Sequence, residues 1–189
     1  MLYTNHSGGC AGADMMWENE GNKYGVTTIA YSFPGHHQDS KNPKVLTPDE
    51  LDEGFKHILI ADQTLHRNVK HMRSTYVRSL LSRNWYQVLN AEAIYAVGFF
   101  GDKERRTVKG GTGWAVQMAL DNQKPVYFLE QATSRDWYTF SNPGWFGLLF
   151  SPPPKLPSNF AGIGTRELDA NGEQAIRDVY HLTFEPKIE

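Results

Sequence analysis

Cysteine is almost absent from this chain, since Cys10 is the only one among 189 residues. A single cysteine excludes an internal disulfide framework and a zinc site built from cysteines. Excess positive charge is also missing, because 19 Lys and Arg face 21 Asp and Glu, for a formal charge of −2. A general DNA or RNA binder needs a basic surface to hold the phosphate backbone, so nucleic acid is not an expected partner.

Long apolar runs are missing as well. The longest stretch without a charged residue, 137–154, contains four prolines together with Ser, Thr and Asn, so it cannot span a membrane. The start MLYTNHSGG has no basic segment followed by an apolar core, so we expect no secretion signal. The remaining composition, 40% hydrophobic and 21% charged, is that of one globular domain over residues 1–189. We expect a cytoplasmic protein without a membrane partner.

Aromatic residues are abundant, at 13% of the chain with five tryptophans. Such residues supply much of the area of a hydrophobic core, and this is the favoured interpretation. The alternative is that some of them stack on a planar ligand. Tyr or Trp residues of the segment 133–159 are the candidates for covering a base.

Strand and helix patterns alternate along the sequence. Strands are predicted at 2–6, 26–32, 93–100, 125–130 and 160–164. Helices are predicted at 11–24, from the capping box at 47–50 onward, at 74–89, from 113 through 119 and beyond, and at 172–182. Loops are expected at 33–46, 100–109 and 133–159, the last long enough to be functional or misassigned. The alternation predicts an α/β, Rossmann-like fold: a parallel sheet with helices on both faces.

Three glycine-rich segments each sit at the end of a predicted strand, before a helix: 7–14 (SGGCAGAD), 110–113 (GGTG) and 162–167 (GIGTRE). Ligands of open parallel sheets bind at the carboxyl ends of the strands, where helix N-termini favour an anion. Glycine there can also serve turn geometry alone, which would make the protein a scaffold. Three such segments at one edge favour a phosphate-bearing ligand. None continues into the Lys-Ser or Lys-Thr pair of a P-loop.

These segments resemble motifs of the SLOG superfamily of Rossmann-like nucleotide-binding proteins. SGGCAGAD is similar to its SGGxxGxD loop. GGTGWAVQ, at 110–117, resembles the GGxGTxxE motif of the cytokinin-activating phosphoribohydrolases, and Arg83-Asn84 matches the position of their Arg-Lys pair. DNA-processing protein A and the YpsA-like proteins belong to the same superfamily.

The order of the motifs is unusual. Gly164-Thr165-Arg166 resembles the GTR or GSR loop that normally ends the first strand of YpsA-like proteins, but here it lies near the C-terminus. The resemblance therefore implies the circularly permuted YpsA-like branch. In that case strand 160–164 should lie beside strand 2–6, and the two termini should be close together.

The resemblance implies a binding site for a nucleotide or nucleotide-derived small molecule, in a protein that forms a homodimer as its relatives often do. No cofactor and no metal are expected. The backbone of the first two glycine segments would hold phosphate, Thr165 and Arg166 would complete the anion site, and Asp14 would contact ribose or cap the first helix. The expected ligand-binding residues are Ser7, Gly8, Gly9, Gly12, Asp14, Arg83, Gly110, Gly111, Thr112, Gly113, Gln117, Gly164, Thr165 and Arg166.

One departure from the hydrolase motif bears on catalysis. Gln117 stands where the hydrolases have Glu, and Trp114 stands where they have Thr. A glutamine amide cannot act as a carboxylate base or stabilise a developing sugar cation by charge. This favours a binder over a nucleotide phosphoribohydrolase, which would need Asp14 or Glu167 as its carboxylate.

Five further residues are weaker candidates. His36 and His37 share a loop with Asp39 and could hold metal or phosphate, but adjacent histidines point apart in an extended chain, which favours solvated residues. Cys10 lies at a predicted helix start, where a nucleophile is conceivable. A small residue in a tight turn is the favoured interpretation. Arg73 and Arg78 are expected on the solvated surface of a helix.

Overall fold

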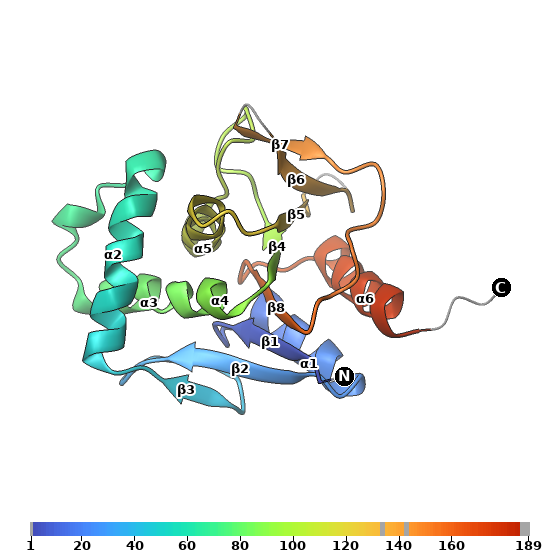
Figure 1. Cartoon of the computed structure of the whole chain (residues 1–189), viewed down its shortest axis with the longest axis horizontal. Helices are drawn as coiled ribbons and strands as arrows, with labels where there is room; N and C mark the ends of the chain where they lie inside the picture. The colour runs from blue at the N-terminus through green and yellow to red at the C-terminus, as the bar shows by residue number, and fades with distance from the viewer. Residues whose placement is uncertain (1, 133–134, 142–143, 186–189) are drawn as a thin grey trace.

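One sheet of eight strands runs through the protein in this computed structural model, which describes residues 2–132, 135–141 and 144–185 (Figure 1). The strand order is β3-β2-β1-β8-β4-β5-β6-β7. All neighbours from β3 to β5 are parallel, and β6 and β7 add an antiparallel hairpin at one edge. The strands are β1 (Thr4–Ser7), β2 (Thr27–Ser32), β3 (Pro43–Val45), β4 (Ala93–Gly98), β5 (Val126–Glu130), β6 (Trp137–Ser141), β7 (Trp145–Leu148) and β8 (Asn159–Gly164).

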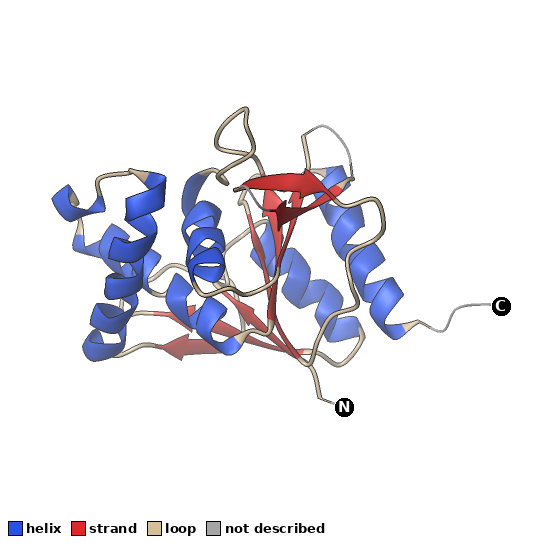
Figure 2. Ribbon diagram, turned by 45° about the horizontal axis from the view of Figure 1, so that its top comes forward, coloured by secondary structure: helices blue, strands red, loops and turns tan. Residues whose placement is uncertain are grey.

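Helices cover both faces of this sheet (Figure 2). One face carries α2 (Pro48–Leu65), η1 (Val69–His71), α3 (Thr75–Ser82), α4 (Asn84–Asn90) and α5 (Gly110–Asp121), and the other carries α1 (Ala13–Lys23) and α6 (Ala170–Phe184). Each face buries its own hydrophobic cluster. The predicted Rossmann-like α/β architecture is thereby confirmed. None of the described helices is long and apolar enough to cross a membrane.

The first and the last strand of the sequence, β1 and β8, are neighbours in the middle of the sheet. β8 pairs with β1 on one side and β4 on the other, so strand 160–164 lies beside strand 2–6 as expected. The Asn5 side chain accepts a hydrogen bond from the Gly162 amide (2.9 Å), which ties these two strands together. The rings of Tyr3 and Phe184 are 4.8 Å apart, so both described ends lie at the same side of the molecule.

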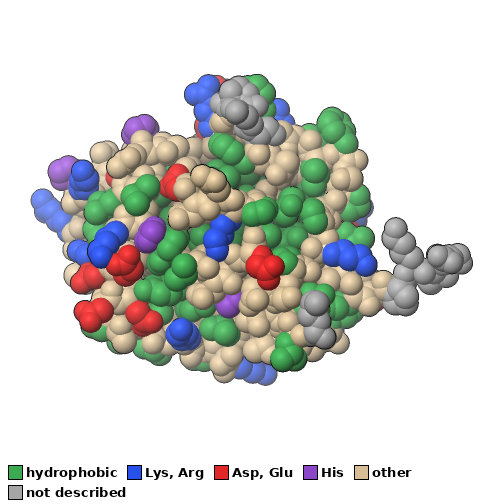
Figure 3. Space-filling model, in the orientation of Figure 1, with side chains coloured by type: hydrophobic (Ala, Val, Ile, Leu, Met, Phe, Trp, Pro, Cys, Tyr) green, Lys and Arg blue, Asp and Glu red, His purple; other side chains and the backbone are tan. Residues whose placement is uncertain are grey.

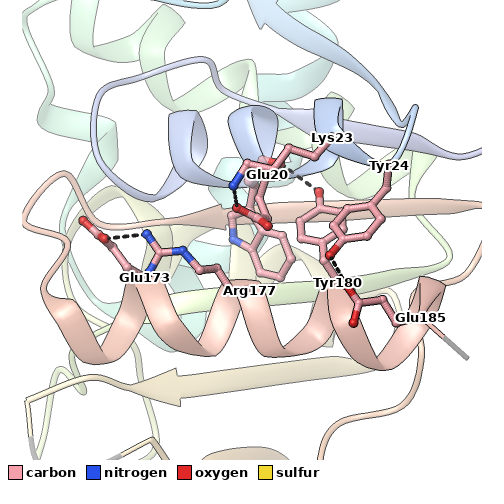
Figure 4. Close-up of polar contacts among 8 residues, drawn as sticks. Glu20, Lys23, Tyr24, Glu173, Arg177, Tyr180 and Glu185 are labelled. Atoms are coloured by element: carbon pink, nitrogen blue, oxygen red, sulfur yellow. Dashed lines mark hydrogen bonds and ion pairs between the residues drawn. The ribbon is translucent and has the colours of Figure 1, made fainter. Parts of the chain in front are cut away.

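The face of α1 and α6 shows where the aromatic residues are used (Figure 4). Trp17 is fully buried, and a Cβ on Gly162 would lie 2.5 Å from its indole ring, so β8 needs glycine at this point. The Tyr180 hydroxyl donates to the Trp17 carbonyl oxygen (2.8 Å) and joins the two helices. Polar contacts rim this layer: Lys23–Glu20, Arg177–Glu173 and Tyr24–Glu185.

Helix α2 begins as the sequence predicts. The Thr47 side chain accepts from the Glu50 amide (3.2 Å), and the Glu50 carboxylate accepts from the Thr47 amide (2.7 Å), which completes the capping box. Pro48 occupies the first helical position, where its missing N–H costs nothing.

The prediction of a single helix at 74–89 is wrong, because the structure has two helices, α3 and α4, that meet at Arg83. A Cβ on Gly54 of α2 would overlap the Ser82 carbonyl oxygen, so α2 presses closely on the end of α3. The Tyr86 amide then donates to the Arg83 carbonyl (3.1 Å), a three-residue step at the start of α4. The segment 110–113 likewise forms the first turn of α5 and does not precede it.

Two segments expected as loops contain strands. The stretch 133–159 includes the hairpin of β6 and β7, and 33–46 includes the short edge strand β3. β3 has only three residues, all exposed, so no alternation marks it. In β7 only Phe146 is buried, while Trp145 and Leu148 remain exposed, which leaves no clear period of two.

Candidate functional site

A cavity of about 380 Å³ opens at the carboxyl ends of the central strands β8 and β4. Its wall comes from the start of α1, the α3–α4 junction, the start of α5 and the segment after β8. This edge is where open α/β sheets bind their ligands. All three glycine-rich segments meet around it and contribute Cys10, Asp14, Gly110, Gly111, Thr112, Gly164, Thr165, Arg166 and Glu167.

The loop between β1 and α1 uses its own N–H donors. The Gly9 amide donates to the Ser7 hydroxyl (3.2 Å), and the Cys10 amide donates to the Asp14 carboxylate (3.2 Å). The Gly8 amide donates to the Gln87 side chain (3.1 Å) in the amide orientation that satisfies both groups. Because these N–H groups already donate hydrogen bonds inside the protein, they have little capacity left to bind a phosphate.

Asp14 links this loop to β8. Its second carboxylate oxygen accepts from the Gly164 amide (3.3 Å), and the side chain is only 6% exposed. The N-cap of α1, Gly12, receives no side-chain hydrogen bond, so the carboxylate does not cap the helix at that position. Burial raises the pKa of Asp14 to about 6, against the opposing attraction of the Arg83 guanidinium.

Arg83 is a buried cation without an ion pair. It is 5% exposed, and no carboxylate in the described part of the chain lies within the 4.0 Å of a salt bridge. Its Nη1 donates to the Gln87 oxygen (2.8 Å), its Nη2 to the Cys10 sulfur (3.3 Å), and its Nε has no partner. Burial lowers the pKa of this guanidinium, which records the cost of keeping it charged there. An anion in the adjoining cavity would offset that cost.

The N-terminus of α5 faces the same cavity through Lys109, Gly110, Gly111 and Thr112. The first N–H groups of a helix have no partner within the helix, and Lys109 supplies no side-chain cap. Nothing lies within 4 Å of where a Cβ on Gly110 or Gly111 would be, so the approach to these donors is open. The helix dipole and the Lys109 charge both favour an anion here.

Arg67 holds this helix start in place from the other side. Its guanidinium donates to the Gly110 carbonyl (2.8 Å) and the Val108 carbonyl (2.7 Å) and stacks over the Trp114 ring at 5.5 Å. A Cβ on Gly113 would overlap the Val108 carbonyl oxygen, so that glycine permits close packing. The glycines of this segment thus have two roles, one toward the cavity and one toward the core.

The segment after β8 brings a second arginine to the site. The Thr165 amide donates to the Val97 carbonyl (2.9 Å), and its carbonyl accepts from the Ala13 amide (2.9 Å), which fixes the backbone. The exposed Arg166 side chain reaches back over the cavity and its Nη2 lies 3.6 Å from the Cys10 sulfur. Arg83 and Arg166 therefore approach one sulfur atom from two separate elements.

His36 also contacts this sulfur. Its Nε2 lies 3.8 Å from the Cys10 Sγ, and its Nδ1 lies 3.1 Å from the Ser32 hydroxyl. Burial, helped by the two guanidiniums, lowers the pKa of His36 to about 4, so the imidazole is neutral at pH 7. The expectation of a solvated loop residue is wrong for His36, while His37 is exposed. The described residues contain no group of three or more His, Cys, Asp or Glu that could hold a metal.

Several predicted site residues lie outside the cavity wall. Gln117, at the hydrolases' Glu position, is buried and donates to Asp121 one turn later (2.8 Å). The others lie at the β1–α1 loop or in the packing of α5: Ser7, Gly8, Gly9, Gly12 and Gly113.

The aromatic residues of 133–159 that were expected to cover a base do not line the cavity where they are described. Within the described part of 133–159 no residue lines the cavity, and Phe99 at the end of β4 is the aromatic side chain in its wall. Sequence reasoning also missed Lys109 and Gln87. Both had a signal, because Lys109 directly precedes the glycine segment and Gln87 follows Arg83 by one helical turn.

Comparison with known proteins identifies a similar fold. No protein-family model matches the chain, and no curated protein matches it significantly. The chain is similar to the crystal structure of a "putative molybdenum carrier protein" from Syntrophus aciditrophicus SB, with 12% identity and a TM-score of 0.50. The match covers 98% of this chain and 96% of that one. At this identity the likeness shows a shared α/β fold alone, because one fold can serve many functions.

Proposed function

We propose that the cavity binds the phosphate group of a nucleotide or a nucleotide-derived small molecule. The observation that carries the proposal is Arg83, a buried guanidinium beside an open cavity that forms no salt bridge with any carboxylate of the described residues. Arg166, Lys109 and the N-terminus of α5 border the same space. Guanidinium groups and helix N-termini are the usual partners of phosphate in proteins.

The rest of the wall suits the remainder of such a ligand. Leu80, Leu81 and Phe99 add apolar side chains to the wall, against which a planar base could rest. The volume of about 380 Å³ falls within the range of small-molecule sites. Asn84 adds an amide group that can accept or donate hydrogen bonds to base or ribose, and the Gln87 amide nitrogen can donate one.

Binding without hydrolysis is the favoured form of this proposal. Gln117 does not line the cavity, and both carboxylate oxygens of Asp14 accept backbone N–H groups. Glu167 is the other carboxylate of the wall and is exposed, so it would be the acid or base of a hydrolase. A carrier role, as the name of the similar structure suggests for that protein, agrees with this form. We expect adenosine 5′-monophosphate to be recovered intact after incubation, whereas release of adenine would favour the phosphoribohydrolase.

Arg166→Ala tests the binding proposal without removing a buried residue. Loss of one charged hydrogen-bonding partner should weaken binding of adenosine 5′-monophosphate and of inorganic phosphate by roughly 1.5–3 kcal/mol. Isothermal titration calorimetry measures both affinities. Arg78→Ala is the matched control, because Arg78 pairs with Asp52 on the surface, away from the cavity. Unchanged affinity in a folded Arg166→Ala protein would remove Arg166 from the site.

We also propose that the chain is a circularly permuted relative of the YpsA-like proteins and forms a homodimer as they often do. The neighbouring position of β8 and β1 supports the permutation, because a GTR strand moved from the start to the end of the chain would keep that place. Sedimentation equilibrium tests the dimer directly.

A further inference from the structure

Gln131 is a fully buried polar residue directly after β5, with 0% of its surface exposed. Its backbone amide donates to the Gly98 carbonyl oxygen at the end of β4 (3.2 Å), which continues the pairing of β5 with β4. Its side chain binds the segment after β8. The Nε2 donates to the Glu167 carbonyl oxygen (2.6 Å), and the Oε1 accepts from the Asp169 amide (3.1 Å). One side-chain amide thus holds a backbone acceptor and a backbone donor of the same short segment.

The segment that Gln131 holds, residues 165–169, carries two side chains of the cavity wall. Arg166 and Glu167 both line the cavity, and both are exposed. A Cβ on Gly12 would lie 2.6 Å from the Cα and from the carbonyl oxygen of Arg166, so the start of α1 packs against this backbone. The Gln131 side chain holds the other end of the segment. The Arg166 side chain therefore extends from a backbone that is fixed on both sides.

The burial of Gln131 is favourable only while both of its side-chain hydrogen bonds form. A buried amide without partners costs free energy, and so do the backbone groups that it would leave unpaired. Groups that bind a ligand must be held to within about 0.5 Å of the productive geometry, usually by hydrogen bonds from residues behind them. Gln131 does not line the cavity and binds the backbone on which Arg166 lies, so it fits this description.

We propose that Gln131 is a positioning residue that sets where Arg166 meets the phosphate group of the ligand. It acts through the backbone at Glu167 and Asp169 and does not touch the ligand itself. The inference rests on the proposed function and deepens it, since it assigns the placement of one phosphate partner to a residue outside the cavity wall.

A double-mutant cycle with Arg166 tests this role, with isothermal titration calorimetry of adenosine 5′-monophosphate as the measurement. Gln131→Met has a similar length and removes both hydrogen bonds, so it should weaken binding about three- to tenfold. In an Arg166→Ala protein the same substitution should change the affinity by less than about twofold, because the side chain that Gln131 positions is absent.

Asn42→Leu is the matched control. It removes a hydrogen bond of the same kind, from a side-chain amide to the Thr28 carbonyl oxygen, next to the edge strand β3. This variant should bind adenosine 5′-monophosphate as the native protein does. Among the described residues, basic and acidic side chains are interspersed on the face seen in Figure 3, so this face offers no broad basic surface for the nucleotide outside the cavity.

Two further measurements guard against a folding defect. Hydrogen exchange of the ligand-free protein should be faster at the Asp169 amide in Gln131→Met and unchanged there in Asn42→Leu. Circular dichroism shows whether each variant is folded. If Gln131→Met does not fold, Gln131→Asn replaces it in the cycle, because it keeps the amide but is one CH₂ group too short to hold both backbone groups.

Two results would overturn the inference: equal affinities of native and Gln131→Met protein, or an equal loss in the native and the Arg166→Ala background, which is the pattern of a general structural defect. Both results require a native protein that binds adenosine 5′-monophosphate. If the native protein bound none, the proposed function would fail and the positioning role with it. The calorimetry therefore distinguishes the two failures.

Discussion

At the scale of residues, one buried carboxylate, that of Asp14, connects the β1–α1 loop to the end of β8. Asp14 accepts from the Cys10 amide in the β1–α1 loop and from the Gly164 amide at the end of β8, so one side chain fixes both segments. The motif SGGxxGxD thus has a structural meaning, in which the last residue closes the loop that the glycines form. Because both oxygens are used in this way, Asp14 positions the cavity wall.

The pH dependence of stability tests this role of Asp14. Its pKa of about 6 in the folded protein exceeds the reference value of 3.8, so the folded protein holds the proton more tightly than the unfolded chain. Stability from this group is therefore fully present below pH 4 and is lost as pH rises through 6, by up to about 3 kcal/mol. Asp14→Asn cannot titrate. We expect the free energy of unfolding of native relative to variant protein to fall between pH 4 and 7 in urea titrations.

Asp39→Asn, at an exposed position, is the control for this measurement and should follow the native pH profile. Parallel profiles for native and Asp14→Asn protein would show that burial of Asp14 does not perturb its titration.

Sequence patterns show residue types but not which of them meet. The motifs that resemble the SLOG superfamily indicated Asp14, Arg83 and Arg166 as site residues, and all three line the cavity. The contact of His36 with Cys10 joins residues 26 positions apart through the fold of a loop without periodicity, so no spacing could reveal it. That no carboxylate in the described ranges forms a salt bridge with Arg83 is likewise a property of three-dimensional packing.

At the scale of helices and strands, the sequence-based predictions agree with the structure for the long elements and differ from it for short ones. The long buried strands β4 and β5 and the capped helix α2 follow their patterns closely, because local signals and burial point the same way. The division between α3 and α4 lies where Gly54 of α2 closely approaches the Ser82 carbonyl oxygen, and the edge strands β3 and β7 are short and largely exposed. These features arise from tertiary packing, which local sequence does not encode.

Two glycines of α5 allow the packing role to be separated from the cavity role. Gly113→Ala places a Cβ against the Val108 carbonyl oxygen, and the backbone there has little room to move. Overpacking of this kind should lower the free energy of unfolding by roughly 1–3 kcal/mol. Gly111→Ala puts its Cβ in open space and should be neutral or stabilising by up to about 1 kcal/mol. Urea denaturation compares the two, and equal stability would contradict the close contact of α5 with Val108.

At the scale of the whole molecule, the centre of the sheet contains strands from opposite ends of the sequence. β8 enters between β1 and β4, so the central part of the sheet and the cavity above it form only after the last strand is in place. The parallel pairings all join strands that are far apart in the sequence. The sequence alone could predict that strands and helices alternate. The neighbouring position of β8 and β1 was expected only from the resemblance to a permuted family.

This topology predicts that a circular permutation of the chain will fold. Tyr3 and Phe184 have rings 4.8 Å apart, so a flexible Gly/Ser linker from residue 185 to residue 2 should join the ends without strain. New ends between Met72 and Arg73 fall in an exposed connection between η1 and α3. We expect cooperative unfolding with a free energy within about 2–3 kcal/mol of native, since joining nearby ends changes mainly chain entropy. A matched permutant opened between Tyr95 and Ala96, inside buried β4, should not fold. If both permutants unfolded, the two ends would have to be farther apart in solution than the contact of Tyr3 with Phe184 allows.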